Sequence, residues 1–430
     1  MGLTRTCKKC ESNFQITDED LSFYEKISPT FDDKKYNLLP PTLCPECREQ
    51  RRWAFRNQSK LYKRKCDFSG EPMISLYSQD KPYKVYKEEI WWSDKWNPMD
   101  YGRDFDFSRP FFEQFSELLH AVPRRGMHQD GTNENSDYTT FGMSNKDCYY
   151  SSTCFFCENS YYSTYLQRGR SCCDCYICFG SELLYECTDC KNCYNCNFCD
   201  NCENCTDSAI LDDCRDCMNC IACKNLRKKA FHIYNKPVSK EEFEKFTAAL
   251  KVNFAEEKAK FDQWKLQLPF ISTHIINSEN CTGDYMENCK NCNFCFNVFQ
   301  DAQDCKYCHW GTGAKDAMDC SMAGLKCELL YEVTATAFAN TCAFMNFCRN
   351  SSNIYYSDCM SACNFCFGCS GLSHKDYCIL NKQYTKEEYE RLVPQIIEHM
   401  KKTGEWGEYF PIEISPFEYK ETVAQEYFPL

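Results

Sequence analysis

Two segments carry apolar residues at intervals of three and four, the spacing that places side chains along one side of a helix. These residues are Phe243, Phe246, Leu250 and Phe254 in the first segment and Tyr389, Leu392, Ile396 and His399 in the second. Each segment follows a capping box, Ser239 with Glu242 and Thr385 with Glu388. The pattern predicts two amphipathic helices whose apolar side either packs on the protein's own core or binds a partner.

Cysteine rather than a larger apolar residue sets the pattern between these helices. From Cys187 to Cys205, seven cysteines recur at every third residue, separated mainly by Asn, Asp, Thr, Lys and Glu. A strand alternates faces every two residues, so this run cannot be one strand. The intervening residues favour turns. We therefore expect successive tight corners with a Cys on either side, as in a narrow solenoid with aromatic rungs at 160–163 and 354–357.

The second half of the chain repeats the first at a constant offset in the numbering. Glu182-Leu-Leu-Tyr-Glu186 recurs as Glu328-Leu-Leu-Tyr-Glu332, 146 positions on. Five cysteines in each half keep the same offset: Cys196, Cys202, Cys217, Cys220 and Cys223 match Cys342, Cys348, Cys363, Cys366 and Cys369. We interpret this as an internal repeat. The intervals between Cys305, Cys320, Cys342 and Cys363 predict rungs of roughly 15 to 22 residues in a parallel β-helix.

These patterns predict a mainly β fold with helices. Two CxxC pairs, Cys7 with Cys10 and Cys44 with Cys47, indicate an N-terminal zinc ribbon. A duplicated Cys-rich β-solenoid follows, and each copy ends in an amphipathic helix. The predicted boundaries are 1–65 for the ribbon with a basic segment, 66–127 for a Trp- and Phe-rich linker domain, 128–273 for the first copy and 274–430 for the second.

The cysteine content bears on whether the thiols are reduced or paired in disulfides. The 430 residues include 38 Cys, a density typical of disulfide scaffolds only in short secreted chains. The first Cys pair follows MGLTRT directly, and no apolar run of membrane-spanning length occurs. We therefore expect a cytoplasmic protein without membrane contact, whose thiols are reduced and serve as metal ligands or as small buried side chains.

The most specific motif lies at the N-terminus. Cys7-Lys-Lys-Cys10 and Cys44-Pro-Glu-Cys47 are two CxxC knuckles. Two such turns place four thiolates in a tetrahedron, and a closed four-cysteine set is typical of structural rather than catalytic zinc. A further knuckle could begin at Cys66, but Ser69 stands where the second Cys is expected. We expect no closed second site there and a buried thiol at Cys66.

This segment resembles a known family. Cys7-Lys-Lys-Cys10, Phe14-Gln-Ile-Thr17, Phe23-Tyr-Glu-Lys26 and Cys44-Pro-Glu-Cys47-Arg48 look like the bacterial probable zinc-ribbon domain over residues 5–52. The stretches YKRKCDFSGE, WWSDKW, DYGRDFDFSRPFFEQF and YCILNKQYTKEEYERL resemble uncharacterised cysteine-rich proteins of candidate-phyla bacteria. The resemblance implies a zinc ribbon and no assigned reaction.

A basic segment follows Cys47. Between residues 48 and 65 lie eight basic residues and one acidic residue, with aromatic residues among them. This composition beside a zinc ribbon suits phosphate contacts and base stacking on RNA or a ribosome. The candidate nucleic-acid-binding residues are Arg48, Arg51, Arg52, Arg56, Lys63, Arg64 and Lys65. The alternative is that their charge meets the acidic repeats of a chain whose net charge is −12.

No standard catalytic motif is present: the sequence holds no phosphate-binding loop, no dinucleotide fingerprint, no HExxH and no GxSxG. The leading hypothesis is a non-catalytic zinc-binding scaffold for RNA, a ribosome or another protein. The alternative is a multi-metal protein, with zinc or iron–sulfur centres, for storage or redox. Its further candidate ligands are Cys214, Cys217, Cys220, Cys223, Cys363, Cys366 and Cys369.

Overall fold

The computed structural model describes residues 2–31, 33–129, 131–180, 182, 197–200, 202–292, 295–298, 302–304, 306, 318–320, 331–336, 342–343, 345–349 and 352–430. Helices and strands occur in similar amounts among them. The expectation of strands combined with helices is confirmed in this coarse form. The run from Cys187 to Cys196, on which much of the corner argument rested, lies outside the described residues.

The N-terminal region consists of short hairpins and helices. Its elements are β1 (Leu3–Thr6), β2 (Asn13–Ile16), α1 (Asp18–Ile27), β3 (Thr30–Phe31), β4 (Lys34–Lys35), α2 (Pro45–Trp53), β5 (Tyr62–Lys65), β6 (Pro72–Ser75), β7 (Val85–Tyr86), α3 (Glu88–Trp91), the 3₁₀ helix η1 (Pro98–Tyr101), α4 (Phe111–Ala121) and β8 (Arg124–Arg125). The hairpins β1–β2 and β5–β6 are antiparallel.

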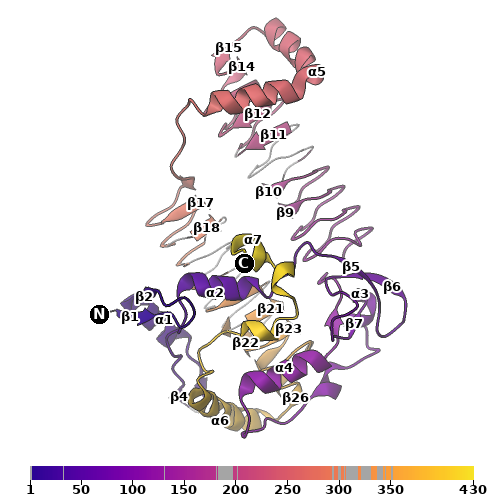
Figure 1. The fold of residues 1–430 in the computed structure, drawn as a ribbon, viewed down its shortest axis with the longest axis vertical. Helices are drawn as coiled ribbons and strands as arrows, with labels where there is room; N and C mark the ends of the chain where they lie inside the picture. The colour runs from indigo at the N-terminus through magenta and orange to yellow at the C-terminus, as the bar shows by residue number, and fades with distance from the viewer. Residues whose placement is uncertain are drawn as a thin grey trace.

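From residue 134 onward the chain forms two stacks of short strands, parallel except for the last strand of each stack (Figure 1). The first stack, the described residues between 134 and 237, contains β9 (Thr164–Gln167), β10 (Tyr176–Phe179), β11 (Asn197–Asp200), β12 (Ala209–Asp212), β13 (Met218–Lys224), β14 (Ala230–Ile233) and β15 (Lys236–Pro237). The second stack, the described residues between 275 and 383, contains β16 (Ile275–Ile276), β17 (Gly283–Glu287), β18 (Cys295–Val298), β19 (Val333–Thr336), β20 (Cys342–Ala343), β21 (Met345–Arg349), β22 (Ser352–Tyr355), β23 (Asp358–Ser361), β24 (Asn364–Phe367), β25 (Asp376–Ile379) and β26 (Lys382–Gln383).

Each turn of the first stack pairs with the residues 12 positions further on. Thr140 pairs with Ser152, and Ser152 with Thr164. In the second stack most pairs keep this offset, although the pairing of Ile275 with Met286 falls one position short of it and that of Lys290 with Gln303 one position beyond it. The longer rung predicted from the sequence is therefore wrong for the described turns. It was taken from intervals between single cysteines, whereas a Cys can occupy any of the inward positions of a turn.

The corners come from left-handed backbone at every third residue. Ser144, Asp147, Tyr150 and Thr153 have φ of 52°, 53°, 50° and 57°. Such φ values cost energy for most side chains, and Asn and Asp tolerate them best. Polar corner residues of this kind recur along both stacks. The expected succession of tight corners is thus observed, with four corners in each full turn.

Cysteines form most of the interior of each stack. A few leucines join them in the first stack, where Cys154, Cys172 and Cys178 are fully buried, and Met, Val, Ile and Leu join them in the second. Buried backbone amides that point inward need acceptors. Cys175 donates its amide to the Ser163 hydroxyl one turn earlier, at 3.1 Å. Alternating Ser and Cys along one column therefore satisfies the amides and still fills the space.

Both predicted helices are confirmed. α5 (Lys240–Lys265) and α6 (Lys386–Thr403) begin after Ser239 and Thr385, each with a complete capping box. α5 packs Phe243 and Leu250 on the outer face of the first stack. α6 packs on the second stack within a large cluster that also includes residues of α1 and α4. For these two helices the structure favours packing on the protein's own core.

The C-terminal segment folds back over the N-terminal region. It contains the 3₁₀ helices η2 (Ile412–Ile414) and η3 (Tyr419–Glu421) and the helix α7 (Val423–Tyr427). The amide of Val423 donates to the carbonyl of Arg56 at 2.9 Å, and the Ser415 hydroxyl donates to the carbonyl of Ala54 at 2.7 Å. α7 and α2 lie beside each other in Figure 1.

Candidate metal centre

Two backbone devices position the four predicted zinc ligands. Cys7 follows β1 in a tight knuckle, in which its amide donates to the carbonyl of Ser12 at 2.9 Å. Cys44 is the N-cap of α2, and Pro45 supplies the first helical residue without needing a hydrogen bond for its nitrogen. Cys47 lies in the first turn of α2, where the helix dipole favours thiolates. Knuckle and helix end therefore bring all four sulfurs together.

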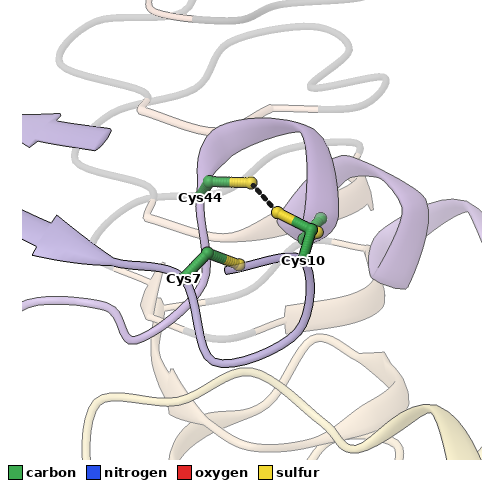
Figure 2. Close-up of side chains that lie close together, drawn as sticks. Cys7, Cys10 and Cys44 are labelled. Carbon is green, nitrogen blue, oxygen red and sulfur yellow. Dashed lines mark hydrogen bonds between the residues drawn. The ribbon is translucent and has the colours of Figure 1, made fainter. Parts of the chain in front are cut away.

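The sulfurs of Cys7, Cys10, Cys44 and Cys47 all lie within 4.8 Å of one another. Figure 2 shows the first three side chains pointing toward a common centre, with Cys10 and Cys44 Sγ atoms 3.6 Å apart. Four sulfurs about 2.3 Å from one ion would be roughly 3.8 Å apart. All four thiols are free, and three are buried. The donor set and its spacing fit a tetrahedral metal ion.

The surroundings polarise the four thiols differently. Burial acts to raise the pKa of Cys7, but the backbone amides of Cys10, Cys44 and Lys9 together lower it to about 6. The hydroxyl of Ser12 lowers the pKa of the exposed Cys10. Burial raises the pKa of Cys44 and of Cys47. Part of the thiolate charge that a metal needs is thus already stabilised by the protein.

The further candidate ligands are arranged differently. Among the residues that the structure describes, the N-terminal set is the only group of three or more metal-binding side chains within 4.8 Å of one another. In the stacks each thiol instead donates to the carbonyl two residues before it, with S···O distances of 3.2 to 3.5 Å. These thiols are Cys214, Cys217, Cys220, Cys223, Cys363, Cys366 and Cys369.

Neighbouring thiols in the stacks also interact in pairs. Cys214 lowers the pKa of its neighbour Cys217 to about 6, and Cys217 in turn raises the pKa of Cys214. Cys220 and Cys223 form a similar pair, with the pKa of Cys220 lowered and that of Cys223 raised. Buried thiols that donate to backbone carbonyls suit packing and hydrogen bonding rather than a four-ligand centre.

Three predicted nucleic-acid-binding arginines lie on the inner side of α2. Arg48 forms an ion pair with Asp319 at 2.9 Å, and Arg51 forms a bidentate pair with Glu332 at 2.8 and 2.9 Å. Arg52 is fully buried near Asp319. These guanidinium groups are therefore enclosed within the chain, as the intramolecular alternative expected, and the prediction that they contact nucleic acid directly does not fit their surroundings.

The rest of the basic segment is divided between buried and exposed residues. Arg56 is buried, donates to the Thr153 hydroxyl at 2.9 Å and lies over the ring of Phe141, 3.9 Å from its centroid. Arg64 is buried and paired with Asp67 at 2.7 Å. Only Lys63 and Lys65 of the seven predicted residues are exposed. Of the predicted nucleic-acid interface, only Lys63 and Lys65 lie where they could contact a nucleic acid, and this part stays a prediction.

The candidate metal centre lies at the start of α2, a helix that contacts both stacks. Arg48, next to Cys47, reaches Asp319 of the second stack. Arg51, in the last turn of α2, reaches Glu332 of the same stack. The end of α2 packs Trp53 with Tyr165 of the first stack, and the following Arg56 reaches Thr153. One short helix thus contacts both stacks, and its first turn holds two candidate metal ligands.

The acceptors of these arginines were not identified individually from the sequence. Burial raises the pKa of Glu332 and Arg51 opposes this effect. Glu408 adds a second partner for Arg51 at 3.2 Å. The signal available was the repeated Glu-Leu-Leu-Tyr-Glu motif, whose last residue in the second half is Glu332. A repeated acidic residue in an otherwise apolar motif can mark a buried ion pair.

Comparisons with known proteins assign no family to this chain. No protein-family model matches the chain, and a search of curated proteins returned no significant match. The described part of the chain has no helix of the length and apolarity needed to span a membrane.

Proposed function

We propose that this chain is a non-catalytic zinc-binding scaffold that presents a rigid surface to another protein. The observation that carries the proposal is the continuity of the Cys7/Cys10/Cys44/Cys47 centre with α2, which contacts both stacks. In small domains a closed four-cysteine zinc site contributes directly to folding. Zinc at this position would order α2 and thereby fix the two stacks relative to each other.

We further propose that the two stacks are the duplicated β-solenoid predicted from the sequence. Asn235 and Asn381, which occupy matching positions in the two halves, support this. Both have φ of 61°. Each side-chain oxygen accepts from an inward amide of the preceding turn, Lys224 at 2.9 Å and Ser370 at 2.8 Å. Each capping-box helix then begins shortly afterwards, at the same place in both halves.

Exposed tyrosines favour a protein as the partner. Tyr149, Tyr150, Tyr161 and Tyr162 belong to neighbouring turns and are 40 to 55% exposed. Tyrosine is enriched at protein interfaces because it combines apolar area with a polar end. RNA remains the alternative partner, through Lys63 and Lys65, but the net charge of −12 and the buried arginines disfavour a polyanion.

The first experiment is metal analysis with a thiol count on protein purified without oxygen. We expect one zinc per chain, with the cysteines outside the N-terminal set reacting as free thiols after unfolding. Several zinc ions, or iron with sulfide, would replace the scaffold proposal with the multi-metal alternative. A chain without metal, in which Cys7 and Cys10 react with alkylating reagents as readily as a free thiol, would remove the zinc proposal.

The partner class is tested by comparing two double variants. We expect Tyr149→Ser with Tyr162→Ser to lose specific cross-links to a protein, and Lys63→Ala with Lys65→Ala to keep them. Retention of poly(U) RNA that depends on salt and is lost in the lysine variant would favour the RNA alternative instead.

A further inference from the structure

Residues 62–91 have the same local structure as the ribbon that carries the metal centre. β5–β6 pairs Tyr62 with Ser75 and Lys65 with Pro72, whereas β1–β2 pairs Leu3 with Ile16 and Thr6 with Asn13. One constant shift along the chain relates all four positions of the first hairpin to those of the second. Each hairpin therefore has the same length, the same register and a connection of the same size.

The knuckles that connect these strands share their hydrogen bonds. In each, the amide of the Cys donates to the carbonyl five residues on, and the amide four residues on donates back to the carbonyl of the Cys. The N···O distances are 2.9 and 3.1 Å for Cys7 and 2.9 and 2.8 Å for Cys66. The residue that makes the return bond is left-handed in both knuckles, with φ of 61° at Glu11 and 75° at Gly70.

The helices that complete the two ribbons also correspond. Cys44 is the N-cap of α2, and Lys87 is the N-cap of α3. In both ribbons the residue after the knuckle Cys donates its amide to the carbonyl two residues before the N-cap, at 3.1 and 3.0 Å. Ile90 thus takes the place of Cys47, and each of them is 8% exposed.

The same amides surround the first sulfur of each ribbon. The Lys9 amide of the first knuckle donates to Cys7 Sγ, and the amide of the N-cap residue Lys87 donates to Cys66 Sγ, both at 3.4 Å. Burial acts to raise the pKa of Cys66, but amides of Ser69, Lys87 and Phe68 lower it. The corresponding amides act on Cys7. Cys66 therefore keeps a backbone environment suited to a metal-bound thiolate.

We propose that residues 62–91 are a second zinc ribbon in which Ser69, Lys87 and Ile90 have replaced three of the four ligands. In this segment apolar packing, rather than a metal ion, holds the knuckle against the start of the helix. Cys66, Tyr86, Ile90 and Trp91 form one buried cluster, with Trp96 packed against it. A lone thiol cannot hold a metal ion, whereas this cluster encloses the same knuckle and helix end without one.

The two ribbons therefore attach to the second stack in different ways. The first reaches it through Arg48 and Asp319 beside the metal centre. The second packs against Cys359, and Arg124, whose strand pairs with β7, forms an ion pair with Asp358 at 3.3 Å. If the first ribbon holds zinc, as proposed above, one attachment depends on metal and the other does not.

Restoring the ligands tests the proposal directly. The variant Ser69→Cys, Lys87→Cys and Ile90→Cys is loaded with cobalt(II), whose absorption identifies tetrahedral thiolate sites. We expect two ions per chain instead of one, and a return to one when Cys66→Ala is added. A triple variant with wild-type circular dichroism that still binds one ion would overturn the proposal.

Hydrogen exchange on the wild-type chain gives a second test that does not require the variant to fold. After zinc removal by a chelator, amides of 62–91 should keep their protection while those of 3–53 lose it. Loss of protection in both segments together would contradict a metal-free second ribbon. If the wild type bound no ion at all, the proposed zinc function would fail, but the triple variant would still be expected to gain one ion.

Discussion

Cysteine pairs with the same CxxC spacing have different roles in two regions of this molecule. At the N-terminus, Cys7–Cys10 and Cys44–Cys47 converge with all sulfurs within 4.8 Å. In the stacks, Cys214–Cys217 and Cys220–Cys223 lie at successive inward positions of one turn and donate to nearby carbonyls.

The difference lies in the backbone. A metal centre needs two chain segments that approach from separate directions, here a knuckle and a helix end. In the stacks a left-handed corner after every third residue turns each successive Cys onto another side of the same turn. The spacing of cysteines alone therefore does not distinguish a ligand from a core residue.

The largest effect should come from exchanging one Cys in each region for Ser. Cys44→Ser removes a candidate ligand. If the cluster holds zinc, as proposed above, we expect loss of the zinc and of amide protection in 3–53, because structural zinc contributes on the order of 10 kcal/mol in small domains. Cys217→Ser should leave the zinc content unchanged. Elemental analysis and hydrogen exchange check both variants, and zinc loss in the Cys217 variant would contradict the distinction.

The ion pairs of α2 should hold the N-terminal segment on the second stack. Arg51→Ala leaves the buried Glu332 without its bidentate partner, and we expect a loss of roughly 3–5 kcal/mol in the free energy of unfolding. The exposed Lys63→Ala should change it by less than about 0.5 kcal/mol. Urea unfolding measures both, and equal values for the two variants would show that α2 is held in another way.

The corners of the stacks can be tested at Asn159. This exposed residue has φ of 50°. Asn159→Val should destabilise the chain by about 1–2 kcal/mol, since a β-branched residue resists the left-handed conformation. Asn159→Gly should be neutral within roughly 0.5 kcal/mol because glycine adopts this conformation freely. If thermal unfolding showed the two variants to be alike, the corner would not limit stability.

The smallest effect is expected inside a stack. Ser163 occupies the position of Cys175 one turn earlier, and its hydroxyl donates to the carbonyl two residues before it at 2.8 Å. Cys175→Ser can form the same bond, so we expect a loss below about 1 kcal/mol. Cys175→Asp places a charge in the same interior and should cost several kcal/mol. A large loss with Ser would show that sulfur itself is required.

What the sequence predicted well depends on nearby residues. The capping boxes at Ser239 and Thr385 begin helices, because each box is specified within a few residues. Each N-terminal knuckle is likewise specified by its own CxxC spacing, and the two knuckles lie together in one four-cysteine cluster. Asn and Asp at many third positions could have indicated the left-handed corners. The true length of the turn was missed because cysteines at intervals of three fit a turn with any multiple of three residues.

What the sequence left open depends on distant contacts. Arg48 and Asp319 are 271 residues apart, so no local pattern could decide between an ion pair and a phosphate contact. The second ribbon was missed for a related reason. Its backbone keeps the knuckle geometry, but three ligands have been replaced, and a search for cysteine spacing finds only Cys66.

The arrangement around α2 also implies an order of events during synthesis. Cys10 and Cys44 are 34 residues apart, so the metal centre can assemble soon after the first segment leaves the ribosome. Arg51 must wait much longer, since Glu332 is 281 residues and Glu408 is 357 residues further along the chain. Until Glu332 has been synthesised, the Arg51 guanidinium group has no carboxylate of the second stack to pair with, so the four-cysteine segment can fold before the contacts that attach it have formed.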